Sequence, residues 1–158
     1  MRHILPMLFL ILCGCATNQH VSNTSLVSTA EQFVHMNEVD DRHILTELMN
    51  VDPVNIAWCA SFVNAILRLN NLPVSDELLL ARSFTSWGQE VSRENIREGD
   101  IVVFPRGDED WQGHVGFYIK TEIINDIEYY IILGGNQNNE VSYKEYRASN
   151  AIAIRRRL

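Results

Sequence analysis

Cysteine is scarce in this chain and occurs at only three positions. Cys13 and Cys15 lie at the end of an apolar segment that opens the sequence, and only Cys59 lies in the remaining chain. That remainder cannot form an internal disulfide or a zinc site built from several cysteines. Cys59 is therefore either a small buried apolar residue or a nucleophile, and the cysteine count alone leaves both interpretations open.

Basic residues are also scarce: 13 Lys and Arg against 20 Asp and Glu give a formal net charge of −7. Nucleic acid is an unfavourable partner for such a chain, because neutralising phosphates requires basic surface. The run Arg155–Arg157 is the one basic cluster, and we expect a solvated chain end there rather than a binding patch. Long apolar runs are lacking too, since Ile4–Leu12 is shorter than the ~20 residues that span a bilayer.

The N-terminal segment reads MRHILPMLFLILCGC, with Arg2 before the apolar run and a small residue before a cysteine. This order is typical of a secretion signal that is later removed. The segment Leu12–Cys15 resembles the bacterial lipobox. The resemblance implies that residues 1–14 are a lipoprotein signal peptide and that Cys15 becomes a lipid anchor carrying diacylglyceryl and a fatty acid such as palmitate. In such lipoproteins an Asp directly after the cysteine usually marks retention in the inner membrane. Ala16 stands at that position here, so the resemblance implies the periplasmic face of the outer membrane. The alternative is an ordinary secreted protein.

The stretch Ala16–Thr29 is rich in Ser, Thr and Asn and shows no apolar periodicity. We therefore predict that residues 15–29 are the lipidated cysteine and a flexible tether. Residues 30–158 have the size of one domain with one core.

Within this domain the spacing of apolar residues changes from helical to alternating. Capping-box spacing from Ser28 to Glu31 predicts a helix to about Met36, and later helices are predicted over 41–49, 58–69 and 77–87. Strands are predicted over 101–104, 114–119, 128–133 and 151–155, with a hairpin turn at Asn125 and Asp126. Helices followed by antiparallel strands indicate an α+β domain.

Two residues of this pattern are candidates for chemistry. Cys59 lies in the first turn of an amphipathic helix, where the helix dipole favours a thiolate. His114 begins an apolar strand after Gly113, at a boundary where a side chain can meet a helix end. His35 and His43 lie among polar residues, and we expect both to be solvated. Cys59 as nucleophile and His114 as base would form the core of a thiol-dependent site.

The hairpin geometry suggests a third member. Counting back from the turn at residues 125–126 places His114 opposite Asn136 or Gln137. Either amide could accept the imidazole N–H, and the choice depends on a register of one residue.

Five segments then carry a resemblance: Trp58–Asn64 (WCASFVN), Ala81–Gly88 (ARSFTSWG), Gly99–Gly107 (GDIVVFPRG), Gly113–Tyr118 (GHVGFY) and Leu133–Gln137 (LGGNQ). In this order they resemble the NlpC-type and CHAP cell-wall hydrolases of the papain-like superfamily. The resemblance implies a papain-like fold with N-terminal helices packed on a small antiparallel sheet. It also implies Cys59 as nucleophile, His114 as base and a polar orienting residue that we assign to Asn136 in preference to Gln137.

The same resemblance implies a substrate, the stem peptides of peptidoglycan, cleaved at an amide bond through a thioester without metal or cofactor. We expect an endopeptidase acting as a monomer. The alternatives are an N-acetylmuramoyl-L-alanine amidase, a transferase or deamidase with the same triad, and a non-catalytic wall-binding lipoprotein on the same fold.

Overall fold

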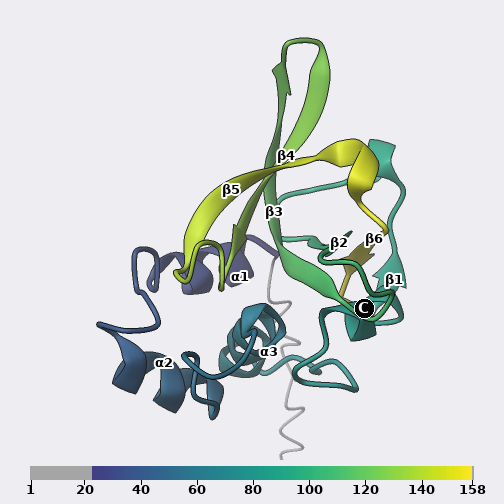
Figure 1. The fold of residues 1–158 in the computed structure, drawn as a ribbon. Helices are drawn as coiled ribbons and strands as arrows, with labels where there is room; N and C mark the ends of the chain where they lie inside the picture. The colour runs from purple at the N-terminus through teal and green to yellow at the C-terminus, as the bar shows by residue number, and fades with distance from the viewer. Residues whose placement is uncertain (1–22, 158) are drawn as a thin grey trace, which may run out of the picture.

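The structure is a computed structural model that describes residues 23–157. Over this range the chain forms an α+β domain with three α-helices and a six-stranded antiparallel sheet (Figure 1), which confirms the predicted class. The α-helices are α1 (Asn23–Glu31), α2 (Arg42–Met49) and α3 (Cys59–Leu69). No helix within the described range is long and apolar enough to cross a membrane.

The strands follow the helices and form one sheet in the order β1-β6-β2-β3-β4-β5. Their bounds are β1 (Gln89–Glu90), β2 (Ile101–Pro105), β3 (Gly113–Ile124), β4 (Ile127–Gly134), β5 (Ser142–Arg147) and β6 (Ala153–Arg156). Short 3-10 helices lie between them: η1 (Ala81–Thr85), η2 (Arg93–Asn95) and η3 (Ala148–Asn150). The predictions for β2, β4 and β6 are confirmed within two residues at each end. The strand predicted over residues 114–119 begins as expected but continues to Ile124 in β3. β1 and β5 were not predicted.

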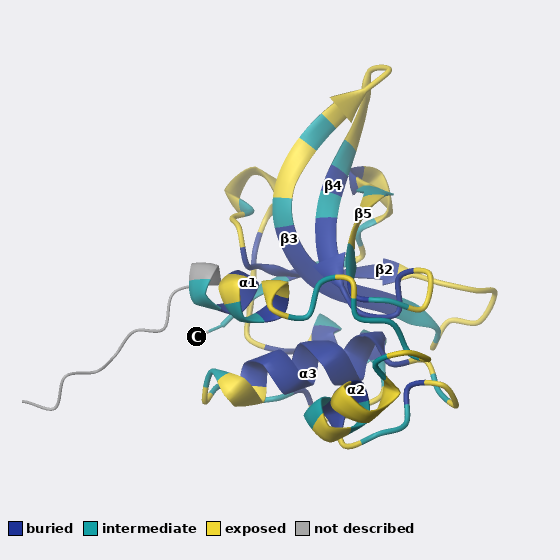
Figure 2. Cartoon of the chain, turned by 90° about the vertical axis from the view of Figure 1, so that its left-hand side faces the viewer, coloured by how far each residue is buried: buried dark blue, intermediate teal, exposed yellow. Residues whose placement is uncertain are grey.

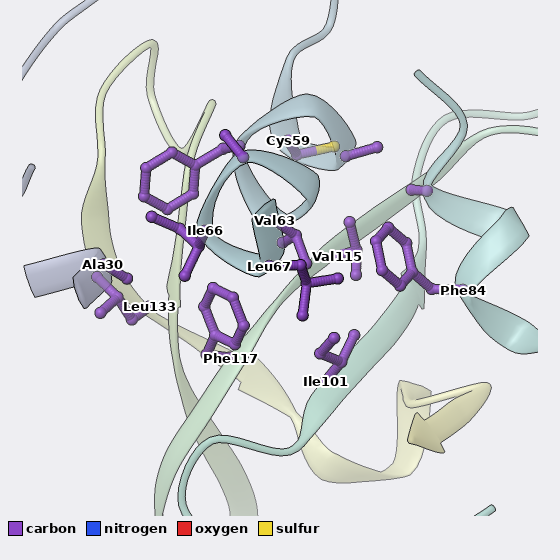
Figure 3. Packing of buried hydrophobic residues seen from close by; sticks show 14 of the residues in the cluster. Ala30, Cys59, Val63, Ile66, Leu67, Phe84, Ile101, Val115, Phe117 and Leu133 are labelled. Atoms are coloured by element: carbon purple, nitrogen blue, oxygen red, sulfur yellow. The ribbon is translucent and has the colours of Figure 1, made fainter. Parts of the chain in front are cut away.

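The main core lies between α3 and one face of the sheet (Figure 3). Every residue of α3 from Cys59 to Leu67 is buried, so this helix is apolar well beyond a single stripe (Figure 2). Alternating strand residues face α3, among them Ile101, Val103, Val115 and Phe117. The residues between them, such as Val102 and Phe104, face a second, smaller apolar cluster. Because successive side chains of a strand point to opposite faces, the two faces of the sheet pack against two different cores.

The predicted tether is wrong in its last part. Residues 23–29 belong to α1, whose Leu26 and Val27 are 1% and 4% exposed in the main core. The folded domain therefore begins by residue 23 and not at residue 30. The polar composition of this stretch concealed a small apolar face that Leu26, Val27 and Ala30 complete at helical spacing. The rest of the tether and the predicted signal peptide lie outside the described residues.

The predicted helix over residues 77–87 is also wrong, because only η1 forms there. Leu80 has extended backbone angles, and Leu78 and Leu79 are exposed. Three consecutive leucines cannot all lie on one face of a helix, so the chain turns Ala81 and Phe84 inward instead.

The chain end is a strand within the sheet and not a solvated tail. β6 lies between β1 and β2, and Arg156 donates from Nε to Oδ1 of the fully buried Asp100 at 2.7 Å. Buried carboxylates require such a partner, which explains why Arg156 occurs in this strand of an acidic chain.

The β3–β4 hairpin turns at Asn125 and Asp126, as predicted, with φ angles of 50° and 62°. Such left-handed angles at both turn positions match the twist of the two strands. The register shifts by one residue between Tyr118 and Lys120, at a β-bulge. On the side of the bulge away from the turn, Phe117 pairs with Leu133, so β3 and β4 stay paired towards the N-terminal end of β3.

Candidate active site

The start of α3 is fixed by the residue before it. Trp58 is fully buried, and its indole Nε1 donates to Oε2 of Glu38 at 2.9 Å. The ring also lies against Gly135, where a Cβ would come within 2.4 Å of Trp58 Cζ3. The backbone after β4 can therefore approach the helix start closely only because residue 135 is glycine. These contacts hold the first turn of α3 in place.

Cys59 is the first residue of α3 (Figure 3) and is 3% exposed. Its Sγ lies 3.9 Å from the carbonyl oxygen of Gly113, the residue before His114. Burial raises the pKa of the thiol, while the backbone N–H of Val115, the charge of Arg106 and the N–H groups at the helix start oppose this rise. The cysteine is thus a buried neutral thiol surrounded by groups that would stabilise a thiolate.

His114 is the second residue of β3 and pairs with Phe104 of β2. Its ring is 2% exposed and stacks on the ring of Tyr146 from β5, with centroids 5.1 Å apart. Tyr146 also stacks on Phe104 at 4.7 Å. The imidazole is therefore held from one side by an aromatic stack that comes from three strands.

Gln137, and not Asn136, contacts the imidazole. Oε1 of Gln137 lies 3.0 Å from Nε2 of His114, whereas Asn136 contributes only its backbone oxygen to a contact with Arg106 at 3.4 Å. The hairpin register had left Asn136 and Gln137 open, and the preference for Asn136, which came from the family resemblance, is wrong. β4 ends at Gly134, and Asn136 has a φ of 58°, so the chain leaves the ladder before the residue that would face His114.

The surroundings of Gln137 determine how its amide points. Its Nε2 donates to the carbonyl oxygens of Ile132 and Ser142, so Oε1 is the atom left to face the ring. An oxygen there must accept a hydrogen, which places the imidazole proton on Nε2. Nδ1 of His114 is then the unprotonated nitrogen. It is buried and has no hydrogen-bond partner, so its lone pair is free to accept a proton.

The charge state of His114 follows from its burial. Desolvation lowers the pKa of the ring to about 4, and the charges of Arg106 and Lys144 act in the same direction, while the bond to Gln137 opposes them. Near neutral pH both the imidazole and the thiol are neutral. No hydrogen bond joins Sγ to the imidazole within the described residues. The ring lies with Phe104 and Tyr146 on the face of the sheet away from α3, whereas Sγ lies on the α3 side of the backbone at Gly113.

Two hollows lie beside these side chains. The first, which we call the cysteine cleft, has a volume of about 440 Å³ and is mainly apolar; its lining includes Cys59, Leu79, Leu80, Arg106, Trp111 and Gly113. The second, the histidine hollow, also has a volume of about 440 Å³ and is polar; its lining includes Arg106, His114, Asn136, Asn138, Lys144 and Tyr146. Arg106, on the loop between β2 and β3, borders both.

Sequence reasoning named Cys59 and His114 as a nucleophile and its base, and the structure places both near the backbone of Gly113 without a hydrogen bond between them. Sequence reasoning missed Arg106, Tyr146 and Glu38. Arg106 could have been found, because it lies in the segment GDIVVFPRG that also contains β2. Tyr146 lies on an unpredicted strand, and Glu38 reaches Trp58 only through the fold. His35 and His43 are exposed, as expected.

No cluster of three or more His, Cys, Asp or Glu side chains that could hold a metal occurs among residues 23–157. Comparison with protein-family models gives no match for this chain, and neither does comparison with curated proteins.

Proposed function

We propose that this chain is a papain-like cysteine hydrolase that cleaves amide bonds in the stem peptides of peptidoglycan. One observation carries the chemical part of the proposal. The thiol at the start of α3 lies beside the backbone that bears His114, and Gln137 holds that ring with its basic nitrogen unprotonated. A helix that bears the nucleophile, packed on an antiparallel sheet that bears the base, supports the papain-like assignment. The peptidoglycan substrate rests on the five sequence segments.

The mechanism follows from the two neutral groups. In the proposed mechanism Nδ1 of His114 takes the thiol proton as Sγ attacks the amide carbonyl, and both groups are neutral before this step. Because no hydrogen bond joins Sγ to the ring in this structure, the two side chains must come within reach of each other when the substrate binds. The N–H groups in the first turn of α3 have no acceptor within the helix and can stabilise the oxyanion. The imidazolium then protonates the leaving nitrogen, the C–N bond breaks and a thioester remains. Water attacks the thioester, gives its proton to Nδ1, and the proton returns to Sγ.

Gln137 is a positioning residue in this mechanism, since it touches the ring and not the substrate. We expect Gln137→Leu to lower kcat about tenfold or more, because an unpaired buried N–H costs about 1–3 kcal/mol. KM should change little. The variant should also shift the acid limb of the kcat profile against pH, which a purely structural role would not do. An unchanged profile would remove Gln137 from the mechanism.

The principal test incubates purified muropeptides with the full chain and with Cys59→Ala, followed by mass analysis of the products. Ser61→Ala is the matched control, because Ser61 lies in the same turn of α3 and its buried hydroxyl has no partner. We expect cleavage by the wild type and the control and none by Cys59→Ala. Equal cleavage by Cys59→Ala would show that the nucleophile is wrong.

The products also separate the alternatives. Release of a peptide that begins with the diamino acid would indicate the preferred endopeptidase, and release of intact stem peptide from the sugar would indicate an amidase. Binding without any product would indicate a non-catalytic wall-binding protein.

We further propose that Cys15 anchors the chain by lipid to the periplasmic face of the outer membrane. The lipobox-like segment supports this proposal, and Cys15 lies outside the described residues. A Cys15→Ser variant should leave the membrane fraction when cells are fractionated. Its retention there would contradict lipidation at this residue.

A further inference from the structure

The histidine hollow is positively charged although the whole chain carries a net charge of −7. Arg106 and Lys144 both line it, and no aspartate or glutamate does. Across residues 23–157 the ion pairs involve other residues, so neither cation is neutralised by a carboxylate. Two unpaired cations at one hollow of an acidic protein indicate a site for an anion.

The present partners of the two cations are weak. Arg106 donates from Nη1 to the backbone oxygen of Asn136 at 3.4 Å. Lys144 donates from Nζ to Oδ1 of Asn138 at 3.3 Å and lies 6.0 Å from the centroid of the Tyr146 ring. Both distances are long for hydrogen bonds, and both acceptors are neutral. A carboxylate would replace them with shorter, charge-assisted bonds, and the guanidinium of Arg106 can bind one in bidentate geometry.

The place of the hollow indicates which part of a substrate would fill it. In the proposed reaction His114 protonates the leaving nitrogen, so the amine portion of the substrate must lie on the side of His114. The cysteine cleft, with Leu79, Leu80 and Trp111, is apolar and lies on the side of the nucleophile. It fits the acyl portion. Arg106, which borders both hollows, lies near the bond between the two portions.

We propose that Arg106 and Lys144 form a subsite for a free carboxylate on the amine portion of the substrate. The substrate class is then an amide whose leaving amino acid carries an ionised carboxyl group near the scissile bond. This inference rests on the proposed function for the direction of the substrate.

The test uses two synthetic stem peptides that differ only in one group of the leaving residue, a free carboxylate in one and a carboxamide in the other. The full chain in detergent, Arg106→Gln, Lys144→Gln and the control Lys120→Gln are compared by kcat/KM at low salt. Lys120 lies on the β3–β4 hairpin and pairs with Glu122 at 2.7 Å, so this control removes the same charge away from both hollows. Arg106 is exposed on a loop, so its variant should fold normally.

We expect the wild type and Lys120→Gln to prefer the acid roughly tenfold to a hundredfold, as charge-assisted hydrogen bonds would give. The preference should fall to about threefold or less in Arg106→Gln, fall in part in Lys144→Gln, and shrink as salt is added. Equal cleavage of the two peptides by the wild type would overturn the subsite and leave the proposed function standing. Persistence of the preference in Arg106→Gln would also overturn it.

A binding measurement separates this inference from the hydrolase proposal. If the wild type cleaves neither peptide, the dissociation constants of both are measured by calorimetry for the wild type and for Arg106→Gln. Tighter binding of the acid by tenfold or more, lost in Arg106→Gln, would support the subsite although the hydrolase proposal had failed. Equal dissociation constants would overturn the subsite.

Discussion

The buried, neutral His114 should make the fold sensitive to acid. The pKa of its ring is lowered to about 4 from an ordinary 6.5 by burial, so the unfolded chain binds a proton there at a pH where the folded chain does not. Stability contributed by the neutral ring is therefore complete above pH ~6.5 and lost as the pH falls to about 4. The two pKa values give a loss of about 2 kcal/mol at pH 5 and about 3 kcal/mol at pH 4. That loss is a large share of the ~5–15 kcal/mol that stabilises a typical domain.

Urea unfolding of the wild type and of His114→Asn between pH 4 and pH 7 measures this effect. The other titrating groups are common to both proteins, so the difference between the two free energies of unfolding isolates His114. We expect this difference to shift by about 3 kcal/mol over the range, in favour of the wild type at the higher pH. His43→Asn, which removes an exposed imidazole, should follow the wild type. A difference that stays constant for His114→Asn would mean that the ring is solvated or already charged in the folded protein.

Two further predictions concern packing around the site and the sheet. Gly135→Ala should destabilise the fold by about 1–3 kcal/mol and reduce activity, because its Cβ would meet Trp58 at 2.4 Å. The control Gly134→Ala, whose Cβ would have its nearest contact at 3.4 Å, should destabilise the fold less. Equal decreases in the melting temperature of the two variants would contradict the close approach at Gly135. Arg156→Met should destabilise by about 3–5 kcal/mol, since it removes the guanidinium that pairs with the buried carboxylate of Asp100. If Arg156→Met unfolds in urea at nearly the same midpoint as the wild type, the importance of that pairing would be refuted.

The helices and strands that have a clear apolar period were predictable from the sequence. α3 and the hairpin of β3 and β4 are examples, because their spacing and the turn at Asn125 and Asp126 depend only on local residues. The position of α1 and the existence of β5 were not predictable in this way, since the helix predicted from Ser28 to about Met36 in fact spans Asn23–Glu31. α1 is short and largely polar, and β5 is mostly exposed, so each owes its conformation to the neighbours on which it packs.

The choice between Asn136 and Gln137 as the partner of His114 also could not be made from the sequence alone. The register of the hairpin correctly led towards residues 136 and 137, but the sequence could not tell where the ladder would stop. The left-handed turn at Asn136 and the donors from Gln137 to Ile132 and Ser142 decided that Gln137 would reach His114. Both features depend on contacts between β4 and β5, which no local pattern encodes.

The sequence by itself determined that one cysteine, Cys59, begins an amphipathic helix and that one histidine, His114, begins an apolar strand. Both facts follow from residue identity and periodicity, which act over a few residues. Only the tertiary structure brought Cys59 beside the backbone of Gly113, buried both side chains until each is neutral, and placed Arg106 between two hollows. Burial and electrostatic surroundings are sums over distant parts of the chain, and so they appear only once the chain has folded.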